Sequence, residues 1–252
     1  MRTIGIIGGM SAESTALYCR RLNEEARRRL GGLHSAEILV WSVDFAPIAE
    51  MQAAGAWTAA GARLADIARR LEGAGADMIL LATNTMHKLA DAIEAAITVP
   101  FLHIADQTAE RIRAAGLKRP GLMATRYTME EAFYKGRLAD RHGLAPIVPD
   151  AEDRASTHRI IYEELCRGIV QAQSRASYEA IAARLVAKGA DCLILGCTEV
   201  GMLLGPANVA VPVFDTTLIH ADAALDLALA EAAPRPGRVA QPTLLGATGT
   251  DG

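Results

Sequence analysis

The sequence predicts an α/β protein with parallel sheets in two similar halves. Two observations support this prediction. Short apolar runs alternate with longer segments whose apolar residues recur at helical spacing, which is the pattern of consecutive βαβ units. In addition, residues 75–85 recur in similar form as residues 189–199.

The first half alternates between strands and helices. Its first strand is expected at Thr3–Ile7 and ends at two glycines. A helix follows from about Ser11 to Arg29, and either Ser11 or Ser14 could cap it. The remaining elements expected here are strands at Ile38–Val43, Asp77–Leu81 and Leu102–Ile104, and a helix at Trp57–Leu71.

The alternation of strands and helices begins again at Gly121–Thr125, which is a strand followed by a turn. Helices are expected at His158–Gln173 and Tyr178–Lys188, and strands at Cys192–Leu195 and Val211–Phe214. Strands that alternate with helices in this way form parallel sheets. Beyond residue 233 the composition shifts to Pro, Gly, Thr and Ala, which predicts a flexible tail.

The internal repeat favours a duplication. Gly75–Thr85 matches Gly189–Glu199 without a gap, and 114 positions separate Thr83 from Cys197. Any helix followed by Gly-Ala-Asp and a strand would look similar, but three further matches occur in the same order: Arg70-Leu71 with Arg184-Leu185, Gly5–Ile7 with Gly121–Met123, and Val99-Pro100 with Val211-Pro212. We therefore expect a first subdomain at 1–115, completed by a helix near 216–233, a second subdomain at 116–215, and a tail at 234–252.

Composition excludes several function classes. Hydrophobic residues make up 51% of the 252 residues, enough for a large core, and the net charge is only −3. No basic run is interleaved with aromatic residues, so we expect no nucleic-acid partner. No apolar stretch has the length of a membrane span, and the N-terminus runs directly into a strand, so we expect no membrane partner, no signal peptide and a cytoplasmic location. The four cysteines show no zinc-ligand spacing and default to free thiols, so no metal is expected.

The repeated strand ends predict where a site lies. Thr83 and Cys197 each follow a strand, and ligands of parallel α/β sheets bind beyond the carboxyl ends of the strands. Two halves that pack face to face would point both residues into one cleft. Gly8–Ser11 and Thr125–Thr128, which follow the other pair of repeated strands, would line the same cleft.

A thiol at such a position could be a nucleophile, a general base or an inert core residue. No His neighbours Cys197 in sequence, although Glu199 and His220 could approach it in space. A thiolate could also remove the weakly acidic Cα proton of an amino acid. Inverting that carbon requires a second group on the opposite face, which a pseudo-symmetric pair supplies.

These motifs resemble the aspartate/glutamate racemase superfamily. The likeness rests on Gly5–Met10, Thr83–Thr85 and Gly196–Glu199, and it extends over about residues 1–233. It is strongest to the amino-acid racemase branch in which the first motif reads Thr-Asn-Thr-Met-His-Lys, here Thr83–Lys88, and whose Thr/Cys pair characterises L-aspartate/glutamate-specific racemases. The resemblance implies two Rossmann-like subdomains related by a pseudo-twofold axis, an active site in the cleft between them, no cofactor, and a homodimer.

Most of that family has cysteine at both catalytic positions, whereas this chain has Thr83 at the first. A threonine hydroxyl does not ionise at accessible pH and is a poor base. The resemblance therefore implies that Cys197 acts as base and acid, that Thr83 is the opposite-face proton donor or relay, and that aspartate or glutamate is the small-molecule substrate. The alternatives are a single-cysteine decarboxylase or isomerase of a small carboxylic acid, and a ligand-binding relative without catalysis.

The resemblance also implies substrate contacts for six residues: Met10, Gln52, Asn84, Thr85, Thr125 and Thr198. Read as sequence alone, Asn84, Thr85 and Thr198 could instead cap helices, and Gln52 could be an exposed helix residue. Glu199 could hold the substrate's amino group or tune the thiol, and as a carboxylate it would raise the pKa of Cys197.

The other candidates have structural roles in this interpretation. His87, His103 and His220 are expected to be structural, and Cys19, Cys166 and Cys192 to be buried small hydrophobes. An acidic substrate side chain is best bound by an Arg or Lys side chain. Some aspartate racemases carry a Lys in the helix that here holds Glu163 and Glu164, so we consider Arg126, Lys135, Arg159 and Arg167, with a neutral or hydroxylated amino acid left open.

Overall fold

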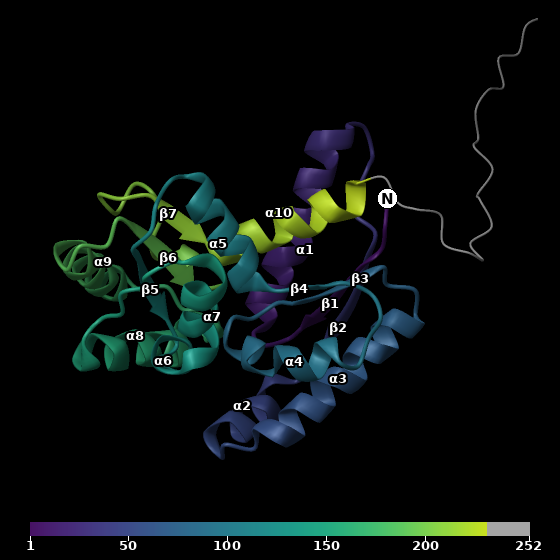
Figure 1. The fold of residues 1–252 in the computed structure, drawn as a ribbon, viewed down its shortest axis with the longest axis horizontal. Coiled ribbons are helices and arrows are strands. Elements are labelled where there is room, and N and C mark those ends of the chain that lie inside the picture. Colours follow the sequence, from purple (N-terminus) through teal and green to yellow (C-terminus); the bar gives the residue numbers. More distant parts are fainter. Residues whose placement is uncertain (231–252) are drawn as a thin grey trace, which may run out of the picture.

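The computed structural model describes residues 1–230, and within this range every paired strand runs parallel, in two separate sheets (Figure 1). The predicted α/β fold with two parallel sheets is therefore confirmed. The tail expected at 234–252 lies outside the described residues.

The first sheet has the strand order β2–β1–β3–β4. Its strands are β1 (Ile4–Gly8), β2 (Ile38–Ser42), β3 (Met78–Leu81) and β4 (Phe101–Leu102). Strands β1 and β3 are buried along their whole length, as expected for the centre of a parallel sheet that is covered on both faces. Ile4 and Ile6 face helices α1 (Ala12–Leu30) and α10 (Thr216–Leu229), whereas Ile7 and Ile79 face α3 (Trp57–Gly73).

The second sheet has the order β5–β6–β7, with β5 (Pro120–Ala124), β6 (Cys192–Gly196) and β7 (Val213–Asp215). Leu193 and Leu195 pack on one face against α8 (Ala151–Glu163) and α9 (Ala172–Ala187). The opposite face carries Leu122 and Ile194, which pack against α5 (Ile104–Ala114) and α7 (Ala132–His142).

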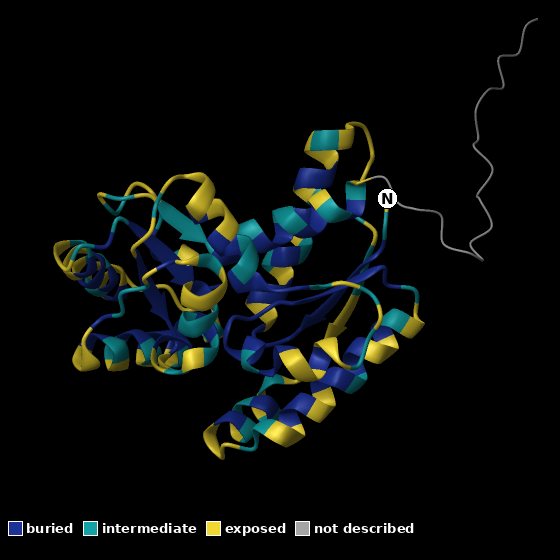
Figure 2. Cartoon of the chain, viewed as in Figure 1, coloured by how far each residue is buried: buried dark blue, intermediate teal, exposed yellow. Residues whose placement is uncertain are grey.

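Shorter helical segments connect these layers. They are α2 (Phe45–Ala53), the 3-10 segment η1 (Thr85–Leu89), α4 (Ala90–Glu94), α6 (Arg126–Glu130), η2 (Leu165–Arg167) and η3 (Val200–Met202). The central strands of both sheets and the inner faces of the helices are buried, whereas the edge strand β2 and the outer helix faces carry exposed residues (Figure 2). We call the first sheet with α1–α4, η1 and α10 the first lobe, and the second sheet with α5–α9, η2 and η3 the second lobe.

Each half of the chain gives one helix to the other sheet. Helix α5 follows β4, yet Ile104, Ala109 and Ile112 are buried in one cluster with Leu122 and Ile194 of the second sheet. Helix α10 follows β7, yet Ala224 and Leu225 are buried in one cluster with β1 and β3. The two exchanged helices also pack on each other (Figure 1). The boundary expected at residue 115 assigns α5 to the first half, whereas its core contacts lie with the second sheet.

Most of the expected helices and strands are confirmed, and the differences lie where the chain reverses direction. Ser11 caps α1, because its Oγ accepts a hydrogen bond from Ser14 N at 3.3 Å. The strand expected at Leu102–Ile104 is wrong at its end, since His103 leaves the sheet and its Nδ1 accepts from Ala105 N to cap α5. The single helix expected at His158–Gln173 is also wrong: α8 ends at Glu163, and the chain reverses through Gly168 at φ 72°.

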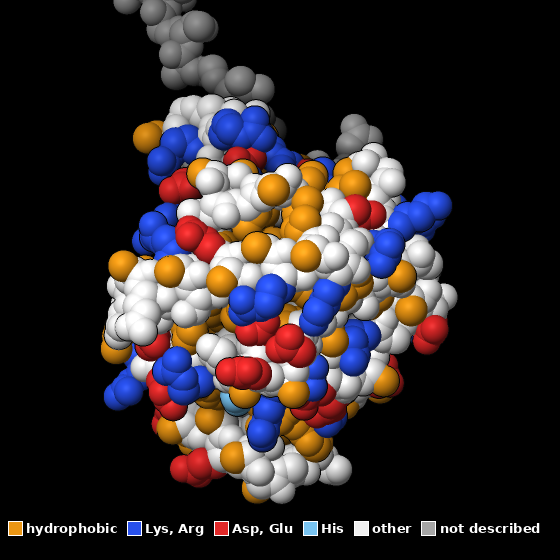
Figure 3. Space-filling view, turned by 90° about the vertical axis from the view of Figure 1, so that its left-hand side faces the viewer, with side chains coloured by type: hydrophobic (Ala, Val, Ile, Leu, Met, Phe, Trp, Pro, Cys, Tyr) orange, Lys and Arg blue, Asp and Glu red, His pale blue; other side chains and the backbone are white. Residues whose placement is uncertain are grey.

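The surface mixes charges of both signs. Figure 3 shows Lys and Arg side chains lying between Asp and Glu side chains on the face formed by the second lobe. Among the helices of residues 1–230, none has the length and apolarity needed to cross a membrane. Within the same range, no group of His, Cys, Asp or Glu side chains is arranged to hold a metal ion.

The exchange of helices gives a stability prediction. Ile112 is fully buried on α5 against the second sheet, so Ile112→Ala should lower the free energy of unfolding by about 2 to 5 kcal/mol through lost burial and the cavity left behind. Glu110→Ala, at an exposed position of the same helix, should stay within about 0.5 kcal/mol. Chemical denaturation followed by circular dichroism measures both, and equal effects would show that α5 does not hold the second sheet.

Candidate active site

A single cavity collects the predicted site residues at the carboxyl ends of both sheets. The free space between its walls is about 350 Å³ when the part open to solvent is counted, of which about 20 Å³ accommodates the centre of a water-sized sphere. All eight residues predicted from the sequence line it: Met10, Gln52, Thr83, Asn84, Thr85, Thr125, Cys197 and Thr198. The structure adds Phe45, Ile161, Tyr162, Cys166, Gly196 and Glu199 to the lining.

The turn after β1 directs Met10 and Ser11 into this region. Gly9 has φ 89°, and a Cβ at Gly9 would lie 2.2 Å from the carbonyl oxygen of Val43, so only glycine fits there. Gly9 N donates to Thr15 Oγ1 at 2.7 Å, which ties the turn to α1. The N-terminal end of α1 therefore points toward the second lobe.

Thr83 is held through its backbone. Its N–H donates to Leu81 O at 2.8 Å, and His87 Nδ1 lies 2.7 Å from Thr83 O. Ile104 N donates to His87 Nε2 at 3.2 Å, so the proton of the neutral ring is on Nδ1 and is donated to Thr83. Burial, followed by His103 and His220, lowers the pKa of His87, which keeps the ring neutral. The structural role predicted for His87 agrees with this geometry.

Cys197 is buried just past the end of β6, and its thiol donates to Glu199. The distance from Sγ to Glu199 Oε2 is 2.9 Å. Burial raises the pKa of Cys197 well above its ordinary value, and the negative charge of Glu199 raises it further. The direction predicted for Glu199 is thus confirmed, and the resting residue is a thiol.

Glu199 is a buried carboxylate satisfied by hydroxyl and thiol donors. It accepts hydrogen bonds from the hydroxyls of Ser11 and Thr198, the latter at 2.6 Å. Ser11 caps α1, so the partial positive charge of that helix N-terminus also favours the carboxylate. Of the side chains in residues 1–230, no Lys or Arg lines the cavity to balance this charge.

Asn84 and Thr198 do not cap helices, so that alternative is wrong for both. Asn84 Nδ2 donates to Thr216 Oγ1 at 3.0 Å, and its Oδ1 is buried without a hydrogen-bond partner among the described residues. Thr125 does cap α6, with its Oγ1 accepting from Thr128 N at 3.4 Å, and it also lies 2.8 Å from Thr85 Oγ1. Thr85 and Thr125 therefore form a hydroxyl pair that joins the two lobes beside the cavity.

The wall opposite this hydroxyl pair comes from α2 and α8. Gln52 is buried, so its interpretation as an exposed helix residue is wrong. Its Oε1 accepts from the Tyr162 hydroxyl at 2.9 Å, and its Nε2 lies 2.9 Å from Met86 Sδ. The Phe45 ring stacks on Tyr162 at 6.2 Å between centroids.

Cys166 has more contacts than its expected role requires. It packs, partly buried, against the core of the second lobe, and it also lines the cavity, with its Sγ 3.9 Å from Glu199 Oε1. Burial and Glu199 both raise the pKa of its thiol. Sequence reasoning missed the position of Cys166 because it extended α8 through this turn, and a glycine two residues after Cys166 was the available signal. Tyr162 lies within α8, and periodicity alone did not show that it reaches the cavity.

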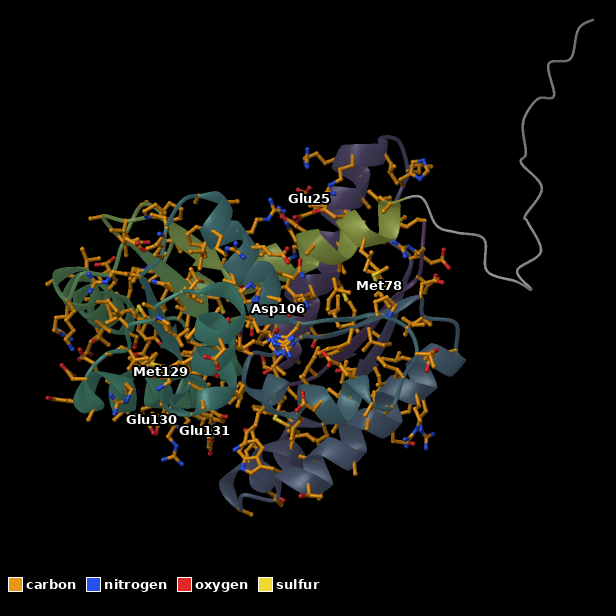
Figure 4. The ribbon with its side chains drawn as sticks, viewed as in Figure 1. Glu25, Met78, Asp106, Met129, Glu130 and Glu131 are labelled. Carbon is orange, nitrogen blue, oxygen red and sulfur yellow. The ribbon has the colours of Figure 1, made fainter. Side chains whose placement is uncertain are left out.

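The lobes also meet at the cavity rim. Lys88 Nζ lies 2.5 Å from Glu131 Oε2 and 3.9 Å from the centroid of the Trp57 ring. Figure 4 shows Glu131 at the edge of the second lobe that faces the first. Lys88 is therefore paired with Glu131 and does not line the cavity.

The four candidate cations are not brought to the site. Arg126, Arg159 and Arg167 are exposed, Lys135 is half-buried on α7, and none of them lines the cavity. Arg126 lies over the Tyr127 ring, and Arg159 pairs with Glu163 at 3.5 Å. The expectation that one of them reaches a substrate carboxylate is not supported by their positions.

Comparison with known proteins adds a family match. A model of the Asp/Glu/Hydantoin racemase family matches residues 7–224. A solved structure of a candidate Asp/Glu racemase from Yersinia pestis is 51% identical, with a TM-score of 0.85, and the match covers 91% of this chain and 100% of that one. An aspartate racemase homologue from Pyrococcus horikoshii OT3 is 33% identical, with a TM-score of 0.79, covering 90% and 99% of the two chains. The broad specificity amino-acid racemase RacX of Bacillus subtilis (strain 168) is 25% identical over 239 residues, 90% of this chain and 98% of RacX.

The contact between Cys197 and Glu199 gives a reactivity prediction. Glu199→Gln removes a negative charge that raises the thiol's pKa, so more thiolate should be present at a given pH. At pH 8, iodoacetamide should modify Cys197 several-fold, on the order of tenfold, faster in this variant, because the thiolate is the form that reacts.

Tandem mass spectrometry, with fragmentation between Cys192 and Cys197, separates Cys197 from the other three cysteines. Glu163→Gln, at an exposed position on α8, is the matched control and should leave the rate unchanged. Slower or equal modification in Glu199→Gln would show that Glu199 does not hold the thiol in its protonated form.

Proposed function

The chain belongs to the Asp/Glu/Hydantoin racemase family, and from this premise we propose that it is a cofactor-independent amino-acid racemase that transfers the Cα proton between Cys197 and the Thr83 side of one cavity. The observation that carries the proposal is the position of these two residues. Each follows a central strand of a different sheet, and both line the same buried cavity.

The cavity offers distinct places for the two charged groups of an amino acid. Glu199 is a buried anion, and Asn84 Oδ1 is a buried acceptor without a partner in the described range, so an α-ammonium group satisfies both. Thr85 and Thr125 share one hydroxyl hydrogen between them, and the remaining O–H of the pair is available to donate to the α-carboxylate. With both ends fixed, the α-carbon lies between Cys197 and Thr83.

Proton removal starts from the resting thiol. The Cys197 S–H proton moves along its hydrogen bond to Glu199, and the thiolate then takes the proton from Cα. The substrate's ammonium group lowers the cost of thiolate formation, because its positive charge stabilises the negative charge once this has moved from Glu199 to the buried sulfur. The electron pair left on Cα delocalises into the α-carboxylate.

The two faces of the carbanion are reprotonated by unequal groups. If Cys197 exchanges its proton with solvent and returns it, the original enantiomer is restored and only isotope exchange is observed. If the Thr83 hydroxyl donates its proton while regaining one from water, the carbon is inverted, and Glu199 gives the proton it took from Cys197 to the hydroxide that forms. From its own side Thr83 starts the reaction only slowly, since its hydroxyl does not ionise at accessible pH.

The resemblance of the motifs favours aspartate or glutamate as substrate. The family and its relatives support amino-acid racemisation, and the side-chain class depends on the part of the cavity that lies away from the α-carbon.

The asymmetry of the pair gives a prediction in D2O. For the enantiomer whose Cα–H faces Cys197, exchange of the α-proton should run ahead of inversion, and the other enantiomer should exchange slowly. Thr83→Cys installs a second ionisable group and should raise exchange of the slow enantiomer by about 10²-fold, the usual size of a general acid–base contribution. Proton NMR of each pure enantiomer measures exchange, and chiral chromatography measures inversion.

Two variants serve as controls. Thr83→Ser keeps the hydroxyl and should behave like the unmodified protein, whereas Cys197→Ala should abolish exchange of both enantiomers. Equal exchange rates for the two enantiomers in the unmodified protein would contradict the asymmetric mechanism. Binding of amino acids with no exchange would instead support a ligand-binding protein.

A further inference from the structure

We propose that the amino acid processed at this site carries an uncharged polar side chain, recognised by Gln52 and Tyr162, rather than the second carboxylate of aspartate or glutamate. This inference rests on the proposed racemase function and concerns the wall of the cavity that the α-centre does not use. That wall is formed by Met10, Phe45, Gln52, Ile161, Tyr162 and Cys166.

The charge of the cavity is the first argument. Its lining holds one ionisable carboxyl group, Glu199, and within the described chain it contains no lysine, arginine or histidine. An amino acid with a neutral side chain adds one ammonium and one carboxylate, so the filled site keeps a single net negative charge. Aspartate or glutamate would add a further buried anion without a counter-ion, which is strongly unfavourable.

The nearest basic side chains are bound elsewhere. Lys88 is paired with Glu131 at the rim, Arg159 is paired with Glu163 on the outer face of α8, and Arg126 stacks on Tyr127. The side-chain wall also borders Glu199, because Cys166 Sγ lies 3.9 Å from Glu199 Oε1. A second carboxylate at this wall would therefore meet a like charge instead of a cation.

The polar groups that do face this wall suit a neutral terminus. The Tyr162 hydroxyl donates to Gln52 Oε1, so the lone pairs of the hydroxyl oxygen stay available as acceptors. Gln52 Nε2 lies against Met86 Sδ, which is a weak acceptor, so its N–H groups can turn to a better one. A terminus with both a donor and an acceptor, such as an amide or a hydroxyl, satisfies Tyr162 and Gln52 together, whereas a carboxylate only accepts.

Matched pairs of amino acids test this inference. Exchange of the α-proton in D2O is measured for both enantiomers of asparagine against aspartate, glutamine against glutamate, and for homoserine. In at least one pair the uncharged member should show a kcat/KM higher by about tenfold or more, because only the charged member buries an unpaired anion. Calorimetric binding of the same compounds to Cys197→Ala, in which chemistry is removed, should give the same ranking.

A second test introduces a charged side chain at this wall of the cavity. Gln52→Lys should reverse the preference toward the acidic member of each pair, by about tenfold or more, because it supplies the missing counter-ion. Gln52→Met has similar length without charge and should not favour the acidic members. Circular dichroism checks that both variants are folded.

The outcomes separate the two proposals. If both aspartate and glutamate exchange as fast as their amide partners or faster, the inference on the side chain is overturned while the racemase function stands. If no amino acid exchanges and none binds, both proposals fail. If the uncharged members bind and exchange preferentially and Gln52→Lys reverses the order, the uncharged class is established.

Discussion

The site depends on the exchange of helices α5 and α10 between the two halves. Each sheet is covered on one face by a helix that the other half of the chain supplies, so the lobes cannot separate without exposing both buried helix faces. The N-terminal end of α10 connects the two sheets directly beside the cavity. Thr216 Oγ1 accepts from Asn84 Nδ2 and donates to Leu195 O at 2.9 Å, and thereby links the ends of β3 and β6. The distance between Thr83 and Cys197 is consequently fixed by the core rather than by loops.

Within this arrangement, the buried Glu199 carboxylate influences the protonation of Cys197. Its hydrogen bonds come from neutral donors, and its charge together with burial keeps Cys197 protonated. In the proposed mechanism a bound ammonium group stabilises the thiolate, so substrate binding favours activation of the base. Without substrate, the buried thiol is expected to resist alkylation and oxidation.

The sequence predicts the parts of this arrangement that follow from strand period and parallel topology. The alternation of strands and helices predicts that the ends of β1, β3, β5 and β6 meet, which places Thr83 and Cys197 at one cavity, whereas Gln52 on α2 was found only through the family resemblance. Periodicity shows that a helix has a buried face but not which sheet covers it, so the exchange of α5 was not predictable. Helix α8 ends at Glu163, earlier than its pattern suggests, and the turn that follows brings Cys166 to the cavity. The candidate cations Arg126 and Arg159 are exposed on their helices, which sequence position alone does not reveal.

The duplication supplies a symmetric frame, and the chemistry requires that the symmetry be broken. Three consecutive positions of the repeat differ: Thr83 corresponds to Cys197, Asn84 to Thr198, and Thr85 to Glu199. An α-carbon carries four different groups, so a symmetric cavity would bind it equally well in two opposite orientations. Thr85 joins the hydroxyl pair with Thr125, whereas Glu199 is an anion, so the carboxylate and ammonium groups have separate places. The orientation that results decides which face of the carbon meets Cys197, and the difference between Thr85 and Glu199 is thus as necessary to the asymmetric reaction as the difference between Thr83 and Cys197.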